Sequence, residues 1–263
     1  MIQNSFTSSL SRAKVLMLHG HGQSGQFFES KTRFLQQRLK DSIIKASHMQ
    51  SDNTYSSDHA DLVDFYYPSG ILPANPDQRE DDAYNSWAWA YGDRKLDRVA
   101  GLEQSLRYLF QILAENGPFI GVVGFSMGAT MAAILASFLE RRESLCGFKF
   151  ETTHPPFKFA VCCSGFKLGN PLFKEFYNSK IETPILHSIA IMDGMIAPLE
   201  SMQLAKSCSR ASLYTFFGTH YVPRSSEFVE TLVDFVMNAL TMRDSDGDWE
   251  DYEDDYTSSS YRV

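Results

Sequence analysis

The sequence predicts an α/β fold: a mostly parallel, doubly wound sheet of about six strands with helices on both faces. Short apolar runs alternate along the chain with stretches in which apolar residues recur at helical spacing. Such alternation builds a parallel sheet that is covered on both sides. The chain has 263 residues, of which 43% are hydrophobic, and it shows no internal repeat. This length suits one large domain.

The predicted domain spans residues 14–243. Residues 1–13 are a Ser-rich N-terminal extension, and residues 42–61 form a polar insertion within the domain. From Asp244 to the end, the chain has eight acidic residues and one basic residue, so nearly all of the net charge of −8 lies there. Such a segment cannot bury a core, and we expect residues 244–263 to be a disordered acidic tail.

The first predicted strand is the short apolar run Lys14–His19, because a buried parallel strand is apolar throughout. Apolar residues then recur at helical spacing, which predicts an amphipathic helix over 27–40. Residues 42–61 mix Ser, Asn, Asp and His, and we expect a loop or a poorly ordered insertion there. The predicted strand 62–67 stops at a proline, and 69–82 is expected to be irregular.

The spacing of leucine and isoleucine predicts a helix over 97–116, which Gly117-Pro118 ends. The apolar run that begins at Phe119 is predicted to be a strand, and an Ala-rich helix follows it to about Arg142. The same two patterns predict the remaining elements. These are strands at 157–164, 184–192 and 211–217, a short helical turn at 171–177, a helix at 199–207 and a closing helix from Phe228 to Leu240.

The turn Gly124-Phe125-Ser126-Met127-Gly128 connects a strand to a helix and matches the pattern G-x-S-x-G. On such a sharp turn the serine hydroxyl is exposed above the sheet edge. Glycine is needed where strand and helix backbones approach closely. The helix N-terminus adds free N–H groups that suit a developing oxyanion. We therefore predict that Ser126 is a nucleophile; the alternative is a packing turn in which Ser126 only caps the helix.

Asp193 and His220 each follow a predicted strand, as Ser126 does. Open α/β sheets bind ligands at the carboxyl ends of their strands. A serine hydroxyl needs a nearby base, which histidine supplies, and the imidazole needs a carboxylate to hold its tautomer. The chain order Ser, Asp, His is the order found in α/β-hydrolases. We predict that the three form a catalytic triad; the alternative for Asp193 is an ordinary Asp-Gly turn.

The other six histidines are weaker candidates for the base because of their positions. They lie in the polar insertion (His48, His59), in a Pro-rich loop (His154), inside a strand (His187) and in the glycine loop after the first strand (His19, His21). That glycine loop follows a strand end, as the nucleophile turn does. We therefore expect the backbone N–H groups of His21 and Met127 to stabilise an oxyanion.

Trp87, Trp89 and Tyr91 form an aromatic cluster next to the irregular stretch. One interpretation is that these side chains form the apolar wall of a pocket for an acyl group. The other is a loop that its aromatic residues pin to the core. The pattern alone leaves both open.

Neither a metal nor a cofactor is expected. The four cysteines, Cys146, Cys162, Cys163 and Cys208, lack metal-ligand spacing, and they fit a reduced compartment. No apolar run is long enough to span a membrane, the N-terminus lacks a secretory signal, and no basic patch suggests nucleic acid. We expect a cytoplasmic or nuclear protein that is not secreted; nothing indicates its oligomeric state.

Motifs along most of the chain resemble those of the fungal serine hydrolases of the FSH family, which includes polyketide-releasing thioesterase-like hydrolases and a mammalian ovarian-cancer-associated relative. The matching stretches are 15–20 with 23–25 and Lys31, 67–68, 116–119 with 124–128, 156–159 with 164–166, 183–187 and 218–223. The resemblance implies a compact α/β-hydrolase that acts on esters or thioesters, with its nucleophile at Ser126, its acid at Asp193 and its base at His220. Met127 stands where the family often has glutamine.

We therefore expect a serine hydrolase that cleaves a small-molecule carboxylic ester or thioester with an apolar acyl group, through an acyl-enzyme at Ser126. The alternative is a non-catalytic hydrolase-like scaffold that binds a partner through its loops or its acidic tail. The full set of Ser126, Asp193 and His220 favours the enzyme, because a binding module does not need all three. Esters and thioesters are not distinguished, since the same groups act on both.

Overall fold

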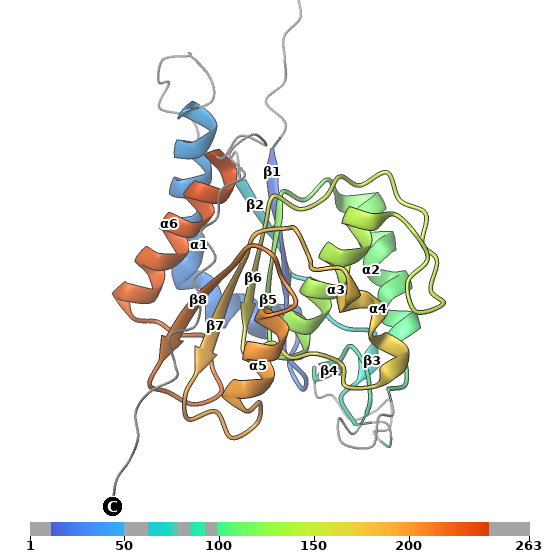
Figure 1. Ribbon diagram of the computed structural model, residues 1–263. Helices are drawn as coiled ribbons and strands as arrows, with labels where there is room; N and C mark the ends of the chain where they lie inside the picture. Colours follow the sequence, from blue (N-terminus) through green and yellow to red (C-terminus); the bar gives the residue numbers. More distant parts are fainter. Residues whose placement is uncertain (1–11, 50–62, 76, 78–84, 93–98, 242–263) are drawn as a thin grey trace, which may run out of the picture.

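A computed structural model of the chain describes residues 12–49, 63–75, 77, 85–92 and 99–241 (Figure 1). Several expectations fall outside these residues: most of the N-terminal extension, the later part of the polar insertion with His59, and the acidic tail. Among the described helices, none is both long enough and apolar enough to cross a membrane.

Six parallel strands form one sheet with the order β2-β1-β5-β6-β7-β8. Their bounds are β1 Ala13–Leu18, β2 Val63–Tyr66, β5 Gly121–Phe125, β6 Phe159–Cys163, β7 Ile185–Ala190 and β8 Ala211–Phe216. Because the strands are parallel, their carboxyl ends meet at one edge of the sheet, at the arrowheads in Figure 1. The strands from β5 to β7 are buried along their whole length, as expected of strands covered on both faces.

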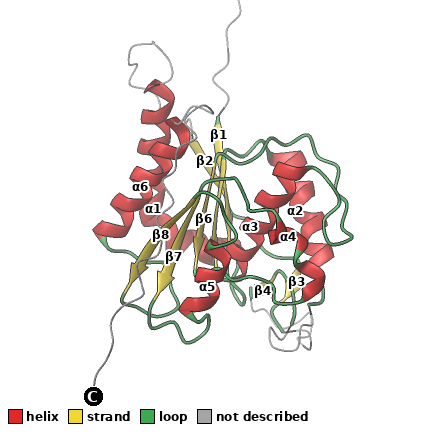
Figure 2. Ribbon diagram, in the orientation of Figure 1, coloured by secondary structure: helices red, strands yellow, loops and turns green. Residues whose placement is uncertain are grey.

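Helices cover both faces of the sheet, which Figure 2 shows in yellow between red helices. On one face, α1 (Gly25–Met49) packs against α6 (Ser226–Thr241). The other face carries α2 (Leu102–Asn116), α3 (Met127–Arg141), α4 (Glu175–Asn178) and α5 (Pro198–Ala205), with a 3-10 turn at Pro171–Phe173 before α4. The predicted doubly wound α/β architecture is confirmed.

The alternation of side chains in β1 explains why there are two cores. Val15 and Met17 join the core beneath α1 and α6, whereas Leu16 and Leu18 join the core beneath α2 and α3. Successive side chains of a strand point to opposite faces, so an unbroken apolar run is what a sheet with two covered faces requires.

The prediction that the first helix ends near Lys40 and that a loop begins at Ser42 is wrong. Helix α1 continues to Met49. Ile43 and Ala46 extend the apolar stripe of the helix and are only 2% and 1% exposed. Nearby polar residues such as Lys45 occupy the exposed face, so the high polar content of this stretch reflects one side of a helix and not a loop.

One strand of a short antiparallel pair, here called the hairpin, lies in the stretch that was expected to be irregular. Strand β3 (Leu72–Pro73) pairs antiparallel with β4 (Trp87–Ala88). From β4, the chain runs beside the loop that follows β1, and Gln23 and Trp87 form an antiparallel bridge there. This bridge brings the aromatic segment Trp87–Tyr91 to the same edge of the sheet as the strand ends.

Candidate active site

Ser126 lies on the turn between β5 and α3. Its backbone has φ 54° and ψ −122°, a conformation that residues other than glycine rarely adopt. Its N–H donates to the oxygen of Cys163 at 2.8 Å, which ties the turn to the end of β6. The Ser126 hydroxyl makes no capping hydrogen bond to α3, so the alternative in which it only caps the helix is wrong.

Gly124 and Gly128 are needed because strand and helix backbones touch at this turn. A Cβ atom on Gly124 would collide with the backbone of Gly128, and a Cβ atom on Gly128 would collide with the carbonyl oxygens of Leu18 and His19. A larger residue at either position would push α3 away from the sheet. The G-x-S-x-G pattern therefore has a steric cause in this protein.

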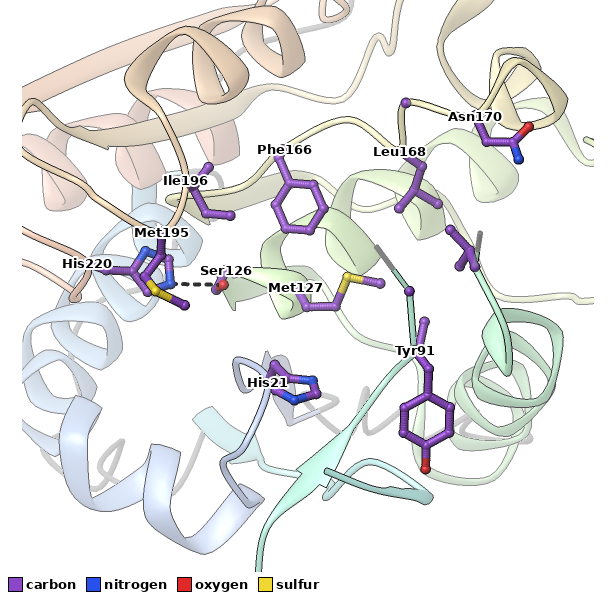
Figure 3. Close-up of a pocket in the computed structure, with 14 residues that line it drawn as sticks. His21, Tyr91, Ser126, Met127, Phe166, Leu168, Asn170, Met195, Ile196 and His220 are labelled. Atoms are coloured by element: carbon purple, nitrogen blue, oxygen red, sulfur yellow. Dashed lines mark hydrogen bonds between the residues drawn. The ribbon is translucent and has the colours of Figure 1, made fainter. Parts of the chain in front are cut away.

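His220 connects Ser126 to Asp193 by two hydrogen bonds. The Nε2 atom of His220 lies 3.0 Å from Ser126 Oγ, the contact marked by the dashed line in Figure 3. The Nδ1 atom of His220 lies 2.7 Å from Asp193 Oδ2. The ends of β5, β7 and β8 thus bring together the three residues that the sequence singled out.

The Asp193 side chain is 1% exposed. Its Oδ1 accepts hydrogen bonds from the N–H groups of Met195 and Ile196, both at 2.9 Å. Burial raises the pKa of Asp193, but the hydrogen bonds from Ile196, His220 and Met195 outweigh burial and hold the pKa below its ordinary value of 3.8. At neutral pH the carboxylate is therefore ionised, so His220 Nδ1 donates to it and Nε2 accepts from the hydroxyl of Ser126. Asp193 is both a turn residue and the partner of His220.

The glycine loop after β1 is held against β4. The Gly22 N–H donates to the oxygen of Trp87, and the Trp87 N–H donates to the oxygen of Gln23, both at 2.9 Å. Within the loop, the Gln23 side chain accepts a hydrogen bond from the Gly20 N–H at 3.1 Å. These bonds fix the backbone of the loop beside the nucleophile turn.

His21, on this loop, and Met127, at the start of α3, line the same cavity as Ser126. Within the described part of the chain, the backbone N–H groups of His21 and Met127 have no hydrogen-bond acceptor. Figure 3 shows both residues around Ser126. Backbone donors that are free and held in place suit the negative charge of an oxyanion.

An apolar cavity of about 290 Å³ opens at Ser126. Besides Ser126, His21 and His220, its lining residues are Ala90, Tyr91, Gly92, Val99, Met127, Phe166, Leu168, Gly169, Asn170, Met195 and Ile196. Most of these side chains are apolar, and Ser126 and His220 lie together at the end of the cavity away from Asn170 (Figure 3). Such a cavity takes a small ligand with an apolar body.

Comparison with models of protein families matches residues 8–232 to the family described as Serine hydrolase (FSH1). The chain belongs to this family. The resemblance that its motifs indicated is thereby confirmed.

Relatives in this family differ in length. The chain is 31% identical over 225 residues to Family of serine hydrolases 2 of Saccharomyces cerevisiae, which covers 84% of this chain and 96% of the yeast protein. It is also 31% identical over 228 residues to a Schizosaccharomyces pombe protein named dihydrofolate reductase, covering 87% of this chain and 48% of that one. The chain thus spans about half the length of this relative and of an uncharacterized hydrolase from the same yeast.

Solved structures agree with the fold. Esterase PE8 superimposes with a TM-score of 0.58 at 20% sequence identity, over 87% of this chain and 93% of that chain. The predicted α/β-hydrolase fold is confirmed.

The prediction that Trp87 and Trp89 line the pocket is wrong; of the three aromatic residues, only Tyr91 lines the cavity. Trp89 is fully buried, and its indole N–H donates to the oxygen of His19 at 2.8 Å. The Trp87 indole N–H donates to the Asn85 side chain at 2.7 Å. Tyr91 is itself tied to the hairpin, as its hydroxyl donates to the oxygen of a β3 residue. The interpretation of a pinned loop describes the two tryptophans.

Three other histidines of this family member are buried. His19 accepts a hydrogen bond from the Gly70 N–H at 2.8 Å, and burial lowers its pKa to about 4. His154 accepts from the Phe119 N–H at 2.7 Å, and burial lowers its pKa as well. His187 is buried inside β7, which lowers its pKa to about 3. All three are neutral at neutral pH, and none contacts Ser126.

Sequence reasoning did not assign several residues of the cavity wall. Phe166 and Leu168 come from the loop after β6, and Met195 and Ile196 come from the loop after β7. The available signal was their position, because each follows a strand that ends at the ligand-binding edge. Among the described residues, no group of His, Cys, Asp or Glu is arranged to hold a metal ion.

Proposed function

We propose that this protein hydrolyses carboxylic esters or thioesters through an acyl-enzyme on Ser126. The observation that supports this best is the hydrogen-bonded series from Ser126 Oγ through His220 to the ionised Asp193, at the mouth of an apolar cavity. Ser126 is the nucleophile, His220 is the general base and Asp193 orients it. Family membership supports hydrolysis as the reaction class.

In the first half of the reaction, Ser126 Oγ attacks the carbonyl carbon of the substrate while its proton passes to His220 Nε2. The imidazolium that forms is stabilised by Asp193 across the 2.7 Å contact. The carbonyl oxygen becomes an oxyanion, and the N–H groups of His21 and Met127 donate to it. His220 then returns the proton to the departing alkoxide or thiolate, and the acyl group stays on Ser126.

In the second half, water takes the place of the departed alcohol or thiol. His220 Nε2 removes a proton from the water, and the hydroxide attacks the acyl carbon. The same two N–H groups stabilise the second oxyanion. His220 gives its proton to Ser126 Oγ, which leaves as a hydroxyl, and a carboxylic acid is released.

An apolar acyl group is the natural occupant of the cavity. Phe166, Leu168 and Ile196 are each about nine-tenths buried or more, and they form its wall together with Met127 and Met195. Each CH₂ group that leaves water contributes ~0.8 kcal/mol. We expect kcat/KM to rise with acyl chain length until the cavity is full.

Labelling with a fluorophosphonate probe tests the nucleophile. Mass spectrometry of the labelled wild-type protein should find the adduct on the peptide that contains Ser126, and Ser126→Ala should abolish labelling. Ser164→Ala is the matched control, because Ser164 also ends a strand with a positive φ of 49° and is buried. That variant should label normally. A folded wild-type protein that does not label, or a Ser126→Ala protein that does, contradicts the proposal.

A pair of substrates with one acyl group separates ester from thioester cleavage. Nitrophenyl esters and N-acetylcysteamine thioesters of the same chain length should both be hydrolysed, since both pass through one acyl-enzyme. Where deacylation is the rate-limiting step, both substrates should have the same kcat. Loss of both activities in Ser126→Ala is the control for a single site.

A further inference from the structure

A second and larger cavity, of about 640 Å³, lies beside the apolar one. The loop after β6, the segment around α4 and the helix α5 form its walls. The two cavities share Leu168, Gly169 and Asn170 as lining residues. The two cavities therefore adjoin at these three residues.

Four lysines line the second cavity: Lys167, Lys174, Lys180 and Lys206. The only acidic residue among its described lining residues is Glu200, whose carboxylate accepts a hydrogen bond from the Ala197 N–H at 2.9 Å. We call this cavity the lysine groove.

These lysine charges are not neutralised by neighbouring acids. Within the described residues, no carboxylate lies within 4.0 Å of any of the four ammonium groups. The Lys167 ammonium lies 4.9 Å from the centre of the Tyr177 ring, and the Tyr177 hydroxyl accepts from the Leu168 N–H at 3.2 Å. Lys167 is thereby held beside a residue that both cavities share.

The positive charge is local. Nearly all of the net charge of −8 belongs to residues after Arg243, so the rest of the chain is close to neutral. At physiological salt, charges act over a Debye length of ~8 Å. A groove lined by four lysines therefore attracts an anion that is already close, such as one carried by a bound substrate.

We propose that the lysine groove is a subsite for an anionic group, a phosphate or a carboxylate, carried by the substrate whose carbonyl carbon lies at Ser126. This rests on the proposed function. Figure 3 shows Leu168 and Asn170 on the side of the apolar cavity away from His220. An apolar segment of the substrate fills the first cavity, and the anion beyond it meets the ammonium groups. Lysine suits this role, because its ammonium group is a point charge on a flexible side chain and can bind phosphate or carboxylate without a fixed geometry.

The anion has two possible sources. It is either a carboxylate at the far end of the acyl group or the phosphates of a thiol carrier such as coenzyme A. Matched substrates distinguish them. One pair is the p-nitrophenyl ester of decanoic acid and the p-nitrophenyl half-ester of decanedioic acid. The other pair is the N-acetylcysteamine thioester and the coenzyme A thioester of decanoic acid.

The test variant is Lys174→Glu combined with Lys206→Glu, since both side chains are exposed and neither lines the apolar cavity. The matched control is Lys45→Glu, which reverses an exposed charge on α1, across the sheet. For the anionic member of at least one pair, KM should be about tenfold higher in the test variant than in the control at low salt, and this difference should narrow at high salt, where the charges are screened. The KM of its neutral partner should change less than about twofold.

A rise confined to the half-ester assigns the anion to the acyl group, and a rise confined to the coenzyme A thioester assigns it to the carrier. Either result supports the subsite. Equal KM changes for anionic and neutral substrates, or no change for any of them, overturn it.

A binding measurement separates this proposal from the proposed function. Ser126→Ala protein, with and without the two charge reversals, is titrated calorimetrically with decanoyl coenzyme A and with decanedioate. Weaker binding of either probe to the reversed protein supports the subsite even if the wild-type protein hydrolyses nothing. Equal binding of both probes to the two proteins overturns it, whatever the activity.

Discussion

The strand-end residues and the aromatic segment Trp87–Tyr91 lie at the same edge of the sheet. The sequence predicted the arrangement of the first correctly, but it predicted the wrong position for the two tryptophans of the second. Ser126, Asp193 and His220 come together as their chemistry required. The tryptophans, which looked like a pocket wall, lie behind the glycine loop and hold it. A catalytic role can be predicted for a polar residue from its position at a strand end, because few types of side chain can act as nucleophile, base or acid. An apolar ring can serve a core or a pocket equally well, so its role depends on which side it faces.

The largest expected effect tests whether the strand-end residues act as one unit. Ser126→Ala and His220→Ala should each reduce kcat by about 10⁵- to 10⁶-fold, and the double variant should be no worse than either. Hydrolysis of a nitrophenyl ester measures this. Losses that multiply in the double variant would mean that the two side chains act independently. That result would contradict the proposal that the strand-end residues act as one unit.

Asp193→Asn should reduce kcat by about 10⁴-fold with little change in KM. The amide cannot stabilise the imidazolium, and it allows the wrong tautomer of His220. A reduction in kcat of less than about tenfold would mean that Asp193 only stabilises the turn, through its hydrogen bonds with the N–H groups of Met195 and Ile196. The N–H groups of those two residues can still bond to the amide oxygen, so circular dichroism should find the variant folded.

Trp89→Phe tests the supporting role of the aromatic segment. The ring is kept, but the oxygen of His19 loses its donor in a buried site, which costs about 1–3 kcal/mol of stability. Because His19 adjoins the glycine loop, kcat should fall about tenfold, which is less than the 10²- to 10³-fold loss that follows removal of a whole oxyanion donor. Trp87→Phe is the matched control and should change kcat less than about twofold, since its indole bond is exposed. If the KM for long acyl chains rises instead, Trp89 belongs to the pocket after all.

The smallest effect concerns stability against acid. The pKa of Asp193 is lowered in the folded protein, so its carboxylate stabilises the fold at pH above its ordinary pKa of 3.8. That contribution is lost as the pH falls through the folded pKa. In urea unfolding, the stability gap between wild type and Asp193→Asn should be full at pH 7 and narrow below pH 3.8. A gap that widens on acidification would contradict the direction of the shift.

Much of the fold was predictable because a parallel sheet covered on both faces imposes a strong pattern. The buried strands from β5 to β7 read as unbroken apolar runs, and α2 and α6 carry apolar stripes. The end of α1 was missed because the buried residues Ile43 and Ala46 lie in a stretch that is mostly polar. The residue composition of a stretch combines both faces of a helix, whereas only one face is buried against the core.

By itself, the sequence determined the architecture and singled out Ser126, Asp193 and His220, since apolar periodicity selects a covered sheet and the proposed nucleophilic chemistry admits few side chains. Only the tertiary structure decided which apolar residues form the cavity wall and that the tryptophans stand behind the glycine loop. It also brought four lysines from separate elements around one groove next to the cavity. The physical reason is that these roles depend on contacts between segments far apart in the chain, and local sequence does not specify them.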